Sequence, residues 1–308
     1  MPHAPSPVVH ERRRLRVAIV IIVTLLVVAF VAVQVRWWLR CQLELHPARV
    51  VPTREERAQA VRDLPSLEEV TFRTRDGLKL VGWFSPGPRR DAIVLVHGLG
   101  ANRAALLGTG RLLARHGHGV LLYDSRASGE SEGDVATWGD LERRDVQAAL
   151  DYVSRRVDVS KDRLGLYGFS VGATTVALVG AADPRVAAVA LGPTWTSLAE
   201  ELADKHGRWG FLSLFPATLA FRSAGITIDA LRPIDVIASI PPRPLFMLGG
   251  DEDKDTPPAV MRRLHSRVPT TEYWVVPGIG HASLEKADPV AFEARFCAFF
   301  DHALPRND

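Results

Sequence analysis

The stretch Arg163-Leu164-Gly165-Leu166-Tyr167-Gly168-Phe169-Ser170-Val171-Gly172 decides the fold, because it joins an apolar strand to a Gly-x-Ser-x-Gly pentapeptide. The apolar run 173–179 follows the pentapeptide and is expected to form a buried helix. A strand, a sharp turn and a helix in this order hold a serine in a strained backbone conformation. Gly168 and Gly172 are needed there because side chains two residues from Ser170 would collide with the strand and the helix. The pattern predicts Ser170 at the head of a helix, where partial positive charge favours an anion.

Short apolar or alternating runs on both sides of this stretch predict one sheet. Two alternating runs separated by Asp76-Gly77 predict an antiparallel hairpin. Most later runs are continuously apolar, as expected for strands that helices cover on both faces. The expected strands are 69–74, 78–84, 92–96, 119–123, 163–167, 186–191, 244–248 and 272–276, and the expected helices include 103–115, 139–156 and 289–303. This alternation predicts an α/β fold with a mostly parallel, doubly wound sheet.

Residues 193–240 interrupt the alternation of strands and helices. The segment is too long for an ordinary connection, so we expect a small helical cap over the strand ends. Its large apolar side chains could line an acyl pocket, touch a bilayer or only pack the cap onto the domain. They are Trp195, Trp209, Phe211, Leu212, Leu214, Phe215, Leu219 and Phe221.

Residues 17–35 carry no charged side chain, and Thr24 and Gln34 are the polar ones. About 20 such residues cross the ~30 Å hydrocarbon layer of a membrane as a helix. Arginines precede the run and tryptophans follow it at positions 37 and 38, so we expect an uncleaved transmembrane anchor whose N-terminus is cytoplasmic. A cleaved signal peptide is the competing interpretation. The run is longer than the usual apolar region of such a peptide, and no Ala-x-Ala site follows it cleanly.

The expected organisation is a cytoplasmic segment (1–16), an anchor (17–35), a stalk or linker (36–65) and an extracytoplasmic domain (66–306) that includes the cap. Residues 1–65 hold ten arginines and five acidic residues, whereas the remainder has a net charge of −2. A nucleic-acid-binding domain needs a basic face, so no nucleic-acid partner is expected.

Two cysteines, Cys41 and Cys297, do not make a disulfide framework, and they could pair or stay free.

A serine hydroxyl is a poor nucleophile at neutral pH, so Ser170 needs a base and a residue that orients the base. The loop after strand 244–248 carries three aspartates, at positions 251, 253 and 255, and the loop after strand 272–276 carries His281. The order Ser, Asp, His therefore predicts a catalytic triad. A calcium loop is the other interpretation of the alternating acids. It fails because Thr256 stands where such a loop needs glycine and Arg262 where it needs glutamate.

Over about residues 66–306, the sequence resembles the α/β-hydrolase superfamily, and most closely its serine aminopeptidase-like and lipase-like members, some of which are membrane-anchored. The resemblance rests on the pentapeptide, the acidic loop and three further motifs, which are His97-Gly98-Leu99-Gly100, Tyr123-Asp124-Ser125-Arg126-Ala127-Ser128-Gly129-Glu130-Ser131-Glu132-Gly133 and Gly278-Ile279-Gly280-His281. The family usually has Arg-Gly where this chain has Arg126-Ala127, a departure that concerns the shape of that loop and not the triad.

The resemblance implies an α/β-hydrolase fold in which Ser170 is the nucleophile and His281 the base. The family pattern Gly-x-x-Asp-x-x-x-Pro falls on positions 250, 253 and 257, so Asp253 is the first choice for the acid, with Asp255 second and Asp251 third.

Backbone N–H groups of Leu99 and Val171 are the expected oxyanion donors, and such donors lower a barrier by ~3 kcal/mol apiece. His97 is expected to orient its loop, and Asp124 and Arg126 are expected to brace loops by hydrogen bonds. His116 and His118 flank a glycine before a strand and fit an ordinary loop, so no metal site and no cofactor are expected.

Together these features predict a membrane-anchored serine hydrolase that cleaves a carboxylic ester, lipid-like or with a small acyl group, through an acyl-enzyme. A peptidase or amidase of the same fold and a non-catalytic binding protein are the alternatives. A thioesterase is less consistent with a domain outside the cytoplasm, and a dehalogenase would carry aspartate in place of Ser170. The expected partners are a small-molecule ester or lipid and the membrane, through the N-terminal helix. The oligomeric state is left open.

Overall fold

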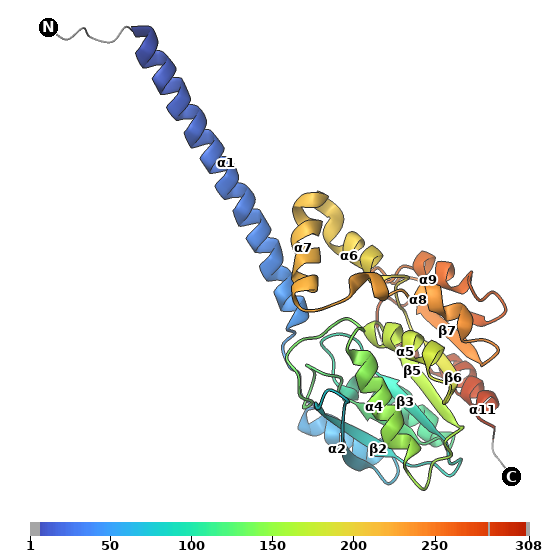
Figure 1. Cartoon of the computed structure of the whole chain (residues 1–308). Coiled ribbons are helices and arrows are strands. Elements are labelled where there is room, and N and C mark those ends of the chain that lie inside the picture. Colours follow the sequence, from blue (N-terminus) through green and yellow to red (C-terminus); the bar gives the residue numbers. More distant parts are fainter. Residues whose placement is uncertain (1–6, 283, 306–308) are drawn as a thin grey trace.

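One mixed sheet organises the protein (Figure 1). The computed structural model describes residues 7–282 and 284–305, and within them eight strands lie in the order β1-β2-β4-β3-β5-β6-β7-β8. β2 pairs antiparallel with β1 and with β4, and the other neighbouring pairs are parallel. The strands are β1 (Glu68–Arg73), β2 (Lys79–Ser85), β3 (Ala92–Val96), β4 (Val120–Tyr123), β5 (Leu164–Gly168), β6 (Val186–Leu191), β7 (Leu245–Gly250) and β8 (Glu272–Val276).

The helices account for most of the remaining chain. The α-helices are α1 (Pro7–Leu45), α2 (Arg54–Asp63), α3 (Leu107–Arg115), α4 (Glu142–Ser154), α5 (Val171–Ala182), α6 (Leu198–His206), α7 (Phe211–Ser223), α8 (Pro233–Val236), α9 (Pro258–His265), α10 (Pro289–Phe292) and α11 (Ala298–Ala303). Short 3-10 segments are η1 (Arg103–Leu106), η2 (Gly207–Trp209), η3 (Ile228–Ala230), η4 (Ile237–Ser239) and η5 (Leu284–Lys286), and η6 (Glu293–Cys297) is π-helical.

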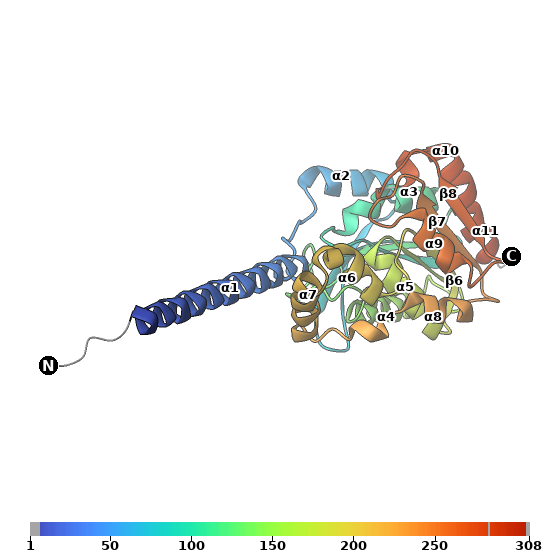
Figure 2. The same cartoon turned by 90° about the horizontal axis from the view of Figure 1, so that it is seen from above.

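Helices cover both faces of the sheet, which gives two apolar cores (Figure 2). In β3 the side chains alternate between them: Val94 and Val96 face the core that α4, α5 and α9 share, and Ile93 and Leu95 face the core of α3 and α11. Both sets are buried, which explains why this strand is continuously apolar. The aromatic residues of the last helical segment pack into the second core. The predicted α/β fold with a mostly parallel, doubly wound sheet is therefore confirmed.

Most elements begin and end within three residues of their predicted positions. Helix α4 is the most shortened, since 139–156 was expected and Glu142–Ser154 is found. The Glu142 carboxylate accepts hydrogen bonds from the backbone N–H groups of Thr137 (2.6 Å) and Gly139 (2.9 Å). These bonds fold the preceding residues into a turn and delay the start of the helix.

The connection between β6 and β7 is helical, and all of its residues are described. It forms α6, η2, α7, η3, α8 and η4. Helices α6 and α7 lie beside the last turns of α1 (Figures 1 and 2). Their buried side chains, together with Trp138 and Trp195, form a third apolar cluster. A small helical cap is thus present where the alternation of strands and helices was interrupted.

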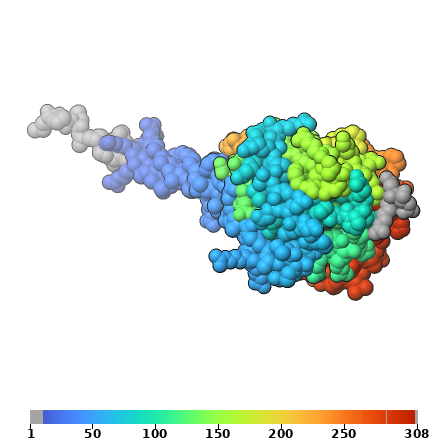
Figure 3. Space-filling view, turned by 90° about the horizontal axis from the view of Figure 1, so that it is seen from below, coloured from blue at the N-terminus to red at the C-terminus, as the bar shows by residue number. Residues whose placement is uncertain are grey.

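Helix α1 projects from the domain as one continuous helix (Figure 3). From Glu11 to Leu45 it is long and apolar enough to cross a membrane, with a mean hydropathy of 3.0 in its most apolar window, none of which is buried in the protein. It also extends beyond the expected anchor, because residues 36–45 of the expected stalk are helical. Cys41 and Leu45 of this extension are fully buried against the cap.

Two of the expected segments include residues outside the described ranges. These are residues 1–6 of the expected cytoplasmic segment and residue 306 of the expected domain. In the rest of the expected linker, α2 begins with a capping box, in which the side chains of Thr53 and Glu56 each accept a hydrogen bond from the backbone N–H of the other residue. Cys41 and Cys297, whose pairing was open, are both free and buried.

Candidate active site

Ser170 lies in the strained turn that the pentapeptide predicts. Its φ of 57° and ψ of −123° place a non-glycine residue in a backbone region that such residues rarely adopt. A Cβ on Gly168 would lie 2.3 Å from the carbonyl oxygen of Gly172, and a Cβ on Gly172 would lie 2.2 Å from that of Val96. Both distances are far below van der Waals contact, so the turn requires glycine at both positions.

His281 and Asp253 come together from the loops that follow β8 and β7. The two atoms in contact are Nδ1 of His281 and Oδ2 of Asp253, 2.8 Å apart, and the Asp253 side chain is fully buried. Its other oxygen accepts hydrogen bonds from the backbone N–H groups of Asp255 (2.9 Å) and Thr256 (2.7 Å). The carboxylate is therefore held from both sides in the position that an orienting acid needs.

The other two aspartates of the acidic loop have different surroundings. Asp251 accepts a hydrogen bond from the backbone N–H of Gly278 (2.7 Å), which ties the two loops together. Asp255 lies in the wall of the cavity that contains Ser170. Of the three candidates, the structure thus brings the first choice, Asp253, into contact with His281.

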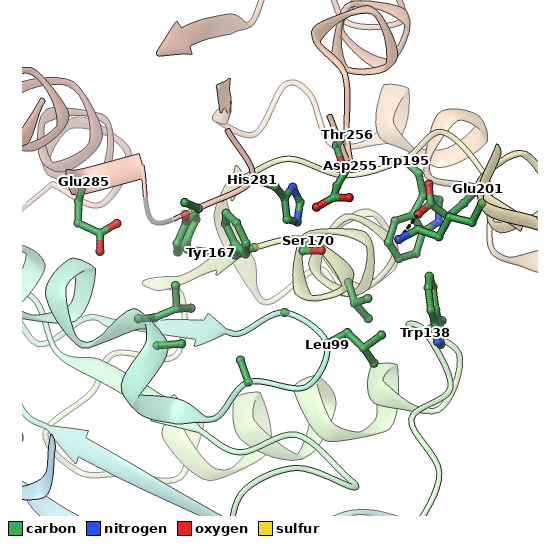
Figure 4. Close-up of a pocket in the computed structure, with 18 residues that line it drawn as sticks. Leu99, Trp138, Tyr167, Ser170, Trp195, Glu201, Asp255, Thr256, His281 and Glu285 are labelled. Carbon is green, nitrogen blue, oxygen red and sulfur yellow. Dashed lines mark ion pairs between the residues drawn. The ribbon is translucent and has the colours of Figure 1, made fainter. Parts of the chain in front are cut away.

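The imidazole of His281 lies over Ser170, and both residues line one cavity of about 330 Å³ (Figure 4). Because Nδ1 faces Asp253, Nε2 is the ring nitrogen left to accept a proton from the serine. Phe169 packs against the imidazole, with 5.0 Å between the ring centroids, and steadies it from the side. This arrangement can generate a serine nucleophile.

Leu99 and Val171 also line this cavity. Val171 is the first residue of α5, so its N–H group has no partner within the helix. Leu99 follows His97-Gly98 in the loop after β3, and a Cβ on Gly98 would lie only 3.1 Å from Cβ of Ser170. The two predicted oxyanion donors are therefore next to the serine, one at a helix N-terminus and one on the facing loop.

His97 is buried and braces the loop that carries Leu99. Its Nε2 accepts a hydrogen bond from the backbone N–H of Ser125 (3.1 Å), so the ring proton is on Nδ1, 2.8 Å from the carbonyl oxygen of Gly98. Burial lowers the pKa of His97 and keeps the ring neutral. This agrees with the expected orienting role.

Asp124 and Arg126 brace the neighbouring loops, as expected. The buried Asp124 carboxylate pairs with the guanidinium of Arg103 and accepts the Arg103 backbone N–H (2.7 Å). Arg126 pairs with Asp145 (2.6 Å) and with Asp76 (3.0 Å).

Ala127, where the family usually has glycine, has a φ of 57°. The loop therefore keeps the left-handed conformation that glycine adopts easily, and alanine is strained in it.

The cavity wall contains Trp195, which was named as a possible lining residue of an acyl pocket, and residues that were not predicted from the sequence, among them Trp138, Glu201 and Lys205. Trp138 and Trp195 pack together, with ring centroids 5.8 Å apart, and form an apolar side. Glu201 and Lys205 form a charged side, with 3.2 Å between the carboxylate and the ammonium group. Burial raises the pKa of Glu201, and the nearby Lys205 opposes that effect. The cavity thus offers an apolar wall and an ionic wall next to Ser170.

Local sequence signals for these residues were uneven. Trp195 lies in the predicted cap and was named from it. Glu201 and Lys205 have the i, i+4 spacing of a helical ion pair, a signal that could have identified them. Trp138 lies in the loop before α4, and no local pattern connects it with Ser170.

His116 and His118 contact carboxylates rather than each other's ring nitrogens. Nδ1 of His118 is 2.8 Å from Asp91, and Nδ1 of His116 is 2.9 Å from Asp301. Among residues 7–282 and 284–305, no group of three or more histidine, cysteine, aspartate or glutamate side chains is arranged to hold a metal ion.

Comparison with known proteins gives a family match over more than half of the chain. Residues 44–219 match the family described as X-Pro dipeptidyl-peptidase (S15 family). The matched region contains Ser170, Leu99 and Val171, whereas Asp253 and His281 lie beyond it.

Two relatives and one solved structure extend this similarity. The uncharacterized protein Rv2307c of Mycobacterium tuberculosis is 30% identical over 231 residues, which cover 73% of this chain and 76% of that protein. The uncharacterized protein YfhR of Escherichia coli is 30% identical over 209 residues, 65% of this chain and 68% of that one. The esterase Pf2001 of Pyrococcus furiosus shares the fold, with a TM-score of 0.69 at 22% identity over 85% of this chain and 98% of that one. The strained Ser170 turn, the eight-stranded sheet and these similarities show that the chain belongs to the X-Pro dipeptidyl-peptidase (S15) family within the α/β-hydrolase superfamily of serine hydrolases.

Proposed function

We propose that this protein is a membrane-anchored serine hydrolase that cleaves carboxylic esters through a Ser170-His281-Asp253 triad. The observation that carries the proposal is the 2.8 Å contact between His281 and the buried Asp253 at the cavity that contains Ser170. A buried carboxylate on Nδ1 fixes the imidazole tautomer in which Nε2 is a base.

The proposed reaction has two halves. Nε2 of His281 takes the hydroxyl proton as Oγ of Ser170 attacks the ester carbonyl, and the N–H groups of Leu99 and Val171 stabilise the resulting oxyanion. The carbonyl re-forms, the ester C–O bond breaks, and His281 gives its proton to the departing alkoxide. A water molecule then loses a proton to His281 and attacks the acyl carbon of the acyl-serine. The bond between that carbon and Oγ breaks, and His281 gives its proton to Oγ, which leaves the carboxylic acid and free Ser170.

The apolar side of the cavity supports an ester with a lipid-like or small acyl group as the substrate class. Leu99, Leu106, Trp138 and Trp195 offer the acyl group an environment without charge. The helix α1, with the arginines that precede its apolar run, supports an anchor that leaves the domain outside the cytoplasm. A reporter fused after residue 308 would then be active on the extracytoplasmic side, and activity in the cytoplasm would contradict this topology.

A peptidase is the second candidate, and the description of the matched family favours it. The chemistry is the same, but the amine leaving group must be protonated before the C–N bond breaks. The ionic wall of Glu201 and Lys205 would suit a charged peptide terminus better than an alkyl chain.

The test is a paired substrate series with the full chain in detergent. Nitrophenyl esters of increasing acyl length are compared with nitroanilides of the same acyl groups and with Xaa-Pro nitroanilides. We expect higher kcat/KM on the esters, loss of activity in Ser170→Ala and full activity in Ser223→Ala, a matched change of an exposed serine on α7. A preference for Xaa-Pro nitroanilides would favour the peptidase, and activity that survives in Ser170→Ala would contradict both candidates.

A further inference from the structure

The cap presents an unusual apolar surface to the outside. We call this surface the α7 stripe, and the side chains that form it are 39–67% exposed. They are Trp209, Phe211, Leu212, Phe215 and Leu219. Positions 211, 215 and 219 recur every four residues and so lie on one side of the helix. The other side, with Ser213, Ala217 and Ala220, is buried against the cap. A contiguous exposed apolar stripe of this kind is typical of a contact surface.

The position of the α7 stripe relative to α1 identifies the contact. The Gln34 side chain donates a hydrogen bond to the carbonyl oxygen of Leu212 (2.9 Å), and α1 and α7 lie side by side (Figures 1 and 2). Gln34 is near the end of the apolar run 17–35, and Trp37 and Trp38 follow it. If α1 spans a bilayer, the first turn of α7 is therefore level with the membrane interface, where tryptophan gathers.

The buried side of α7 continues toward the cavity. Ala217 and Phe221 belong to the same apolar cluster as Trp138, Val171 and Trp195, which line the cavity beside Ser170. Cys41 and Leu45 at the end of α1 complete this cluster. Helix α7 thus lies between the expected membrane surface and the cavity, with one side toward each.

We infer that the α7 stripe is a second membrane-contact surface, inserted into the lipid leaflet beside α1, and that the cavity takes esters that reside in the bilayer. The inference rests on the proposed anchor and deepens the proposed substrate class. Each exposed aromatic or leucine side chain that enters the acyl region adds to membrane affinity by the hydrophobic effect. Insertion on one side of α7 would hold the cap and the cavity against the lipid surface.

A depth measurement tests the inference without any use of activity. The full chain is reconstituted into phosphatidylcholine vesicles with an environment-sensitive dye on Phe211→Cys or Phe215→Cys, and quenching by lipids brominated on the acyl chain is recorded. Cys41 and Cys297 are buried, so unsubstituted protein serves as the labelling blank. Val27→Cys in α1 is the membrane reference, and Val157→Cys and Val290→Cys, which are 91% and 79% exposed, are the matched references on the domain.

The expected result is quenching at positions 27, 211 and 215 and none at 157 and 290. Quenching at 27 alone would overturn the second contact and leave the anchor in place, whereas no quenching at 27 would overturn the anchor together with this inference. Because the readout needs no substrate, a failed hydrolase assay would not affect it.

A kinetic comparison tests the substrate source. In the Phe211→Ser/Phe215→Ser double variant we expect hydrolysis of an ester embedded in vesicles to fall by about tenfold or more, because two aromatic side chains no longer enter the lipid. Hydrolysis of a short soluble ester should be unchanged, because neither residue is in the cavity wall. An equal fall on both substrates, or none on the vesicle ester, would overturn the inference.

Discussion

Nδ1 of His281 lies 2.8 Å from Oδ2 of Asp253, although 28 positions separate the two residues in the chain. The contact forms because β7 and β8 are neighbouring parallel strands, so the loops after them leave the same edge of the sheet. Backbone N–H groups of Asp255 and Thr256 hold the second oxygen of Asp253. The position of the His281 ring is thus set by the sheet and by the local turn of the acidic loop.

Replacement of Asp253 by asparagine should lower kcat for ester hydrolysis by about 10⁴, since the amide no longer selects the tautomer in which Nε2 accepts a proton. Asp255→Asn is the matched control, because Asp255 lines the cavity and Asp253, not Asp255, is in contact with His281. We expect less than tenfold loss in the control. Steady-state kinetics with one nitrophenyl ester checks both, and an equal loss in the two variants would contradict the assignment of the acid.

Gly168→Ala and Gly172→Ala should each destabilise the protein by about 2 kcal/mol or more, because the new Cβ would overlap backbone atoms that cannot move freely. Both should also lose activity, since relief of the overlap displaces Ser170. Gly207→Ala is the control, as a Cβ there meets no atom within 4 Å. Thermal unfolding in detergent measures the effect, and the prediction is wrong if the three variants melt together.

Ala127→Gly should stabilise the protein by up to about 1 kcal/mol. The substitution removes the strain of an alanine at φ 57°, which outweighs the extra freedom of glycine in the unfolded chain. In Ala148→Gly, within α4, the same change should instead destabilise by about 1 kcal/mol. Melting temperatures of the two variants should therefore move in opposite directions, and a fall in both would show that the loop does not strain Ala127.

Stability should fall as the pH drops below about 6.5, in part because of His97. Burial lowers its pKa in the folded state, so the unfolded chain takes up a proton there first and acid favours unfolding. The contribution has a slope of at most about 1.4 kcal/mol per pH unit. His97→Asn should be less stable at pH 7.5 yet show a flatter decline between pH 6.5 and 5. Parallel pH profiles of melting temperature for the two proteins would contradict this.

The sheet could be predicted because its physical causes are local. Apolar runs such as 92–96 mark strands covered on both faces, and Asp76-Gly77 marks the hairpin between β1 and β2. Ser170 was predictable for the same reason, since glycine at 168 and 172 follows from steric overlap within one turn. Which aspartate contacts His281 was harder to predict, because the three alternating aspartates have the same local surroundings in sequence and only the fold of their loop distinguishes them.

Features that depend on distant partners could not be predicted. Residues 36–45 were expected to belong to a stalk or linker, but they continue α1, and Cys41 and Leu45 pack against the cap. Nothing in residues 36–45 indicates the cap that buries them. Trp138 likewise reaches the cavity only because the loop before α4 folds toward the cap. Such contacts join segments far apart in the chain, 57 positions for Trp138 and Trp195 and more for residues 36–45 and the cap, so local periodicity does not encode them.

The most direct test of the triad is covalent labelling of the full chain with a fluorophosphonate, followed by identification of the modified residue. The account predicts one adduct on Ser170, formed in wild type and in Ser223→Ala and absent from Ser170→Ala. It also predicts that labelling slows strongly in His281→Ala, since the serine then has no base. An adduct on another residue, or equal labelling of Ser170→Ala, would contradict the claim that Ser170 is the nucleophile.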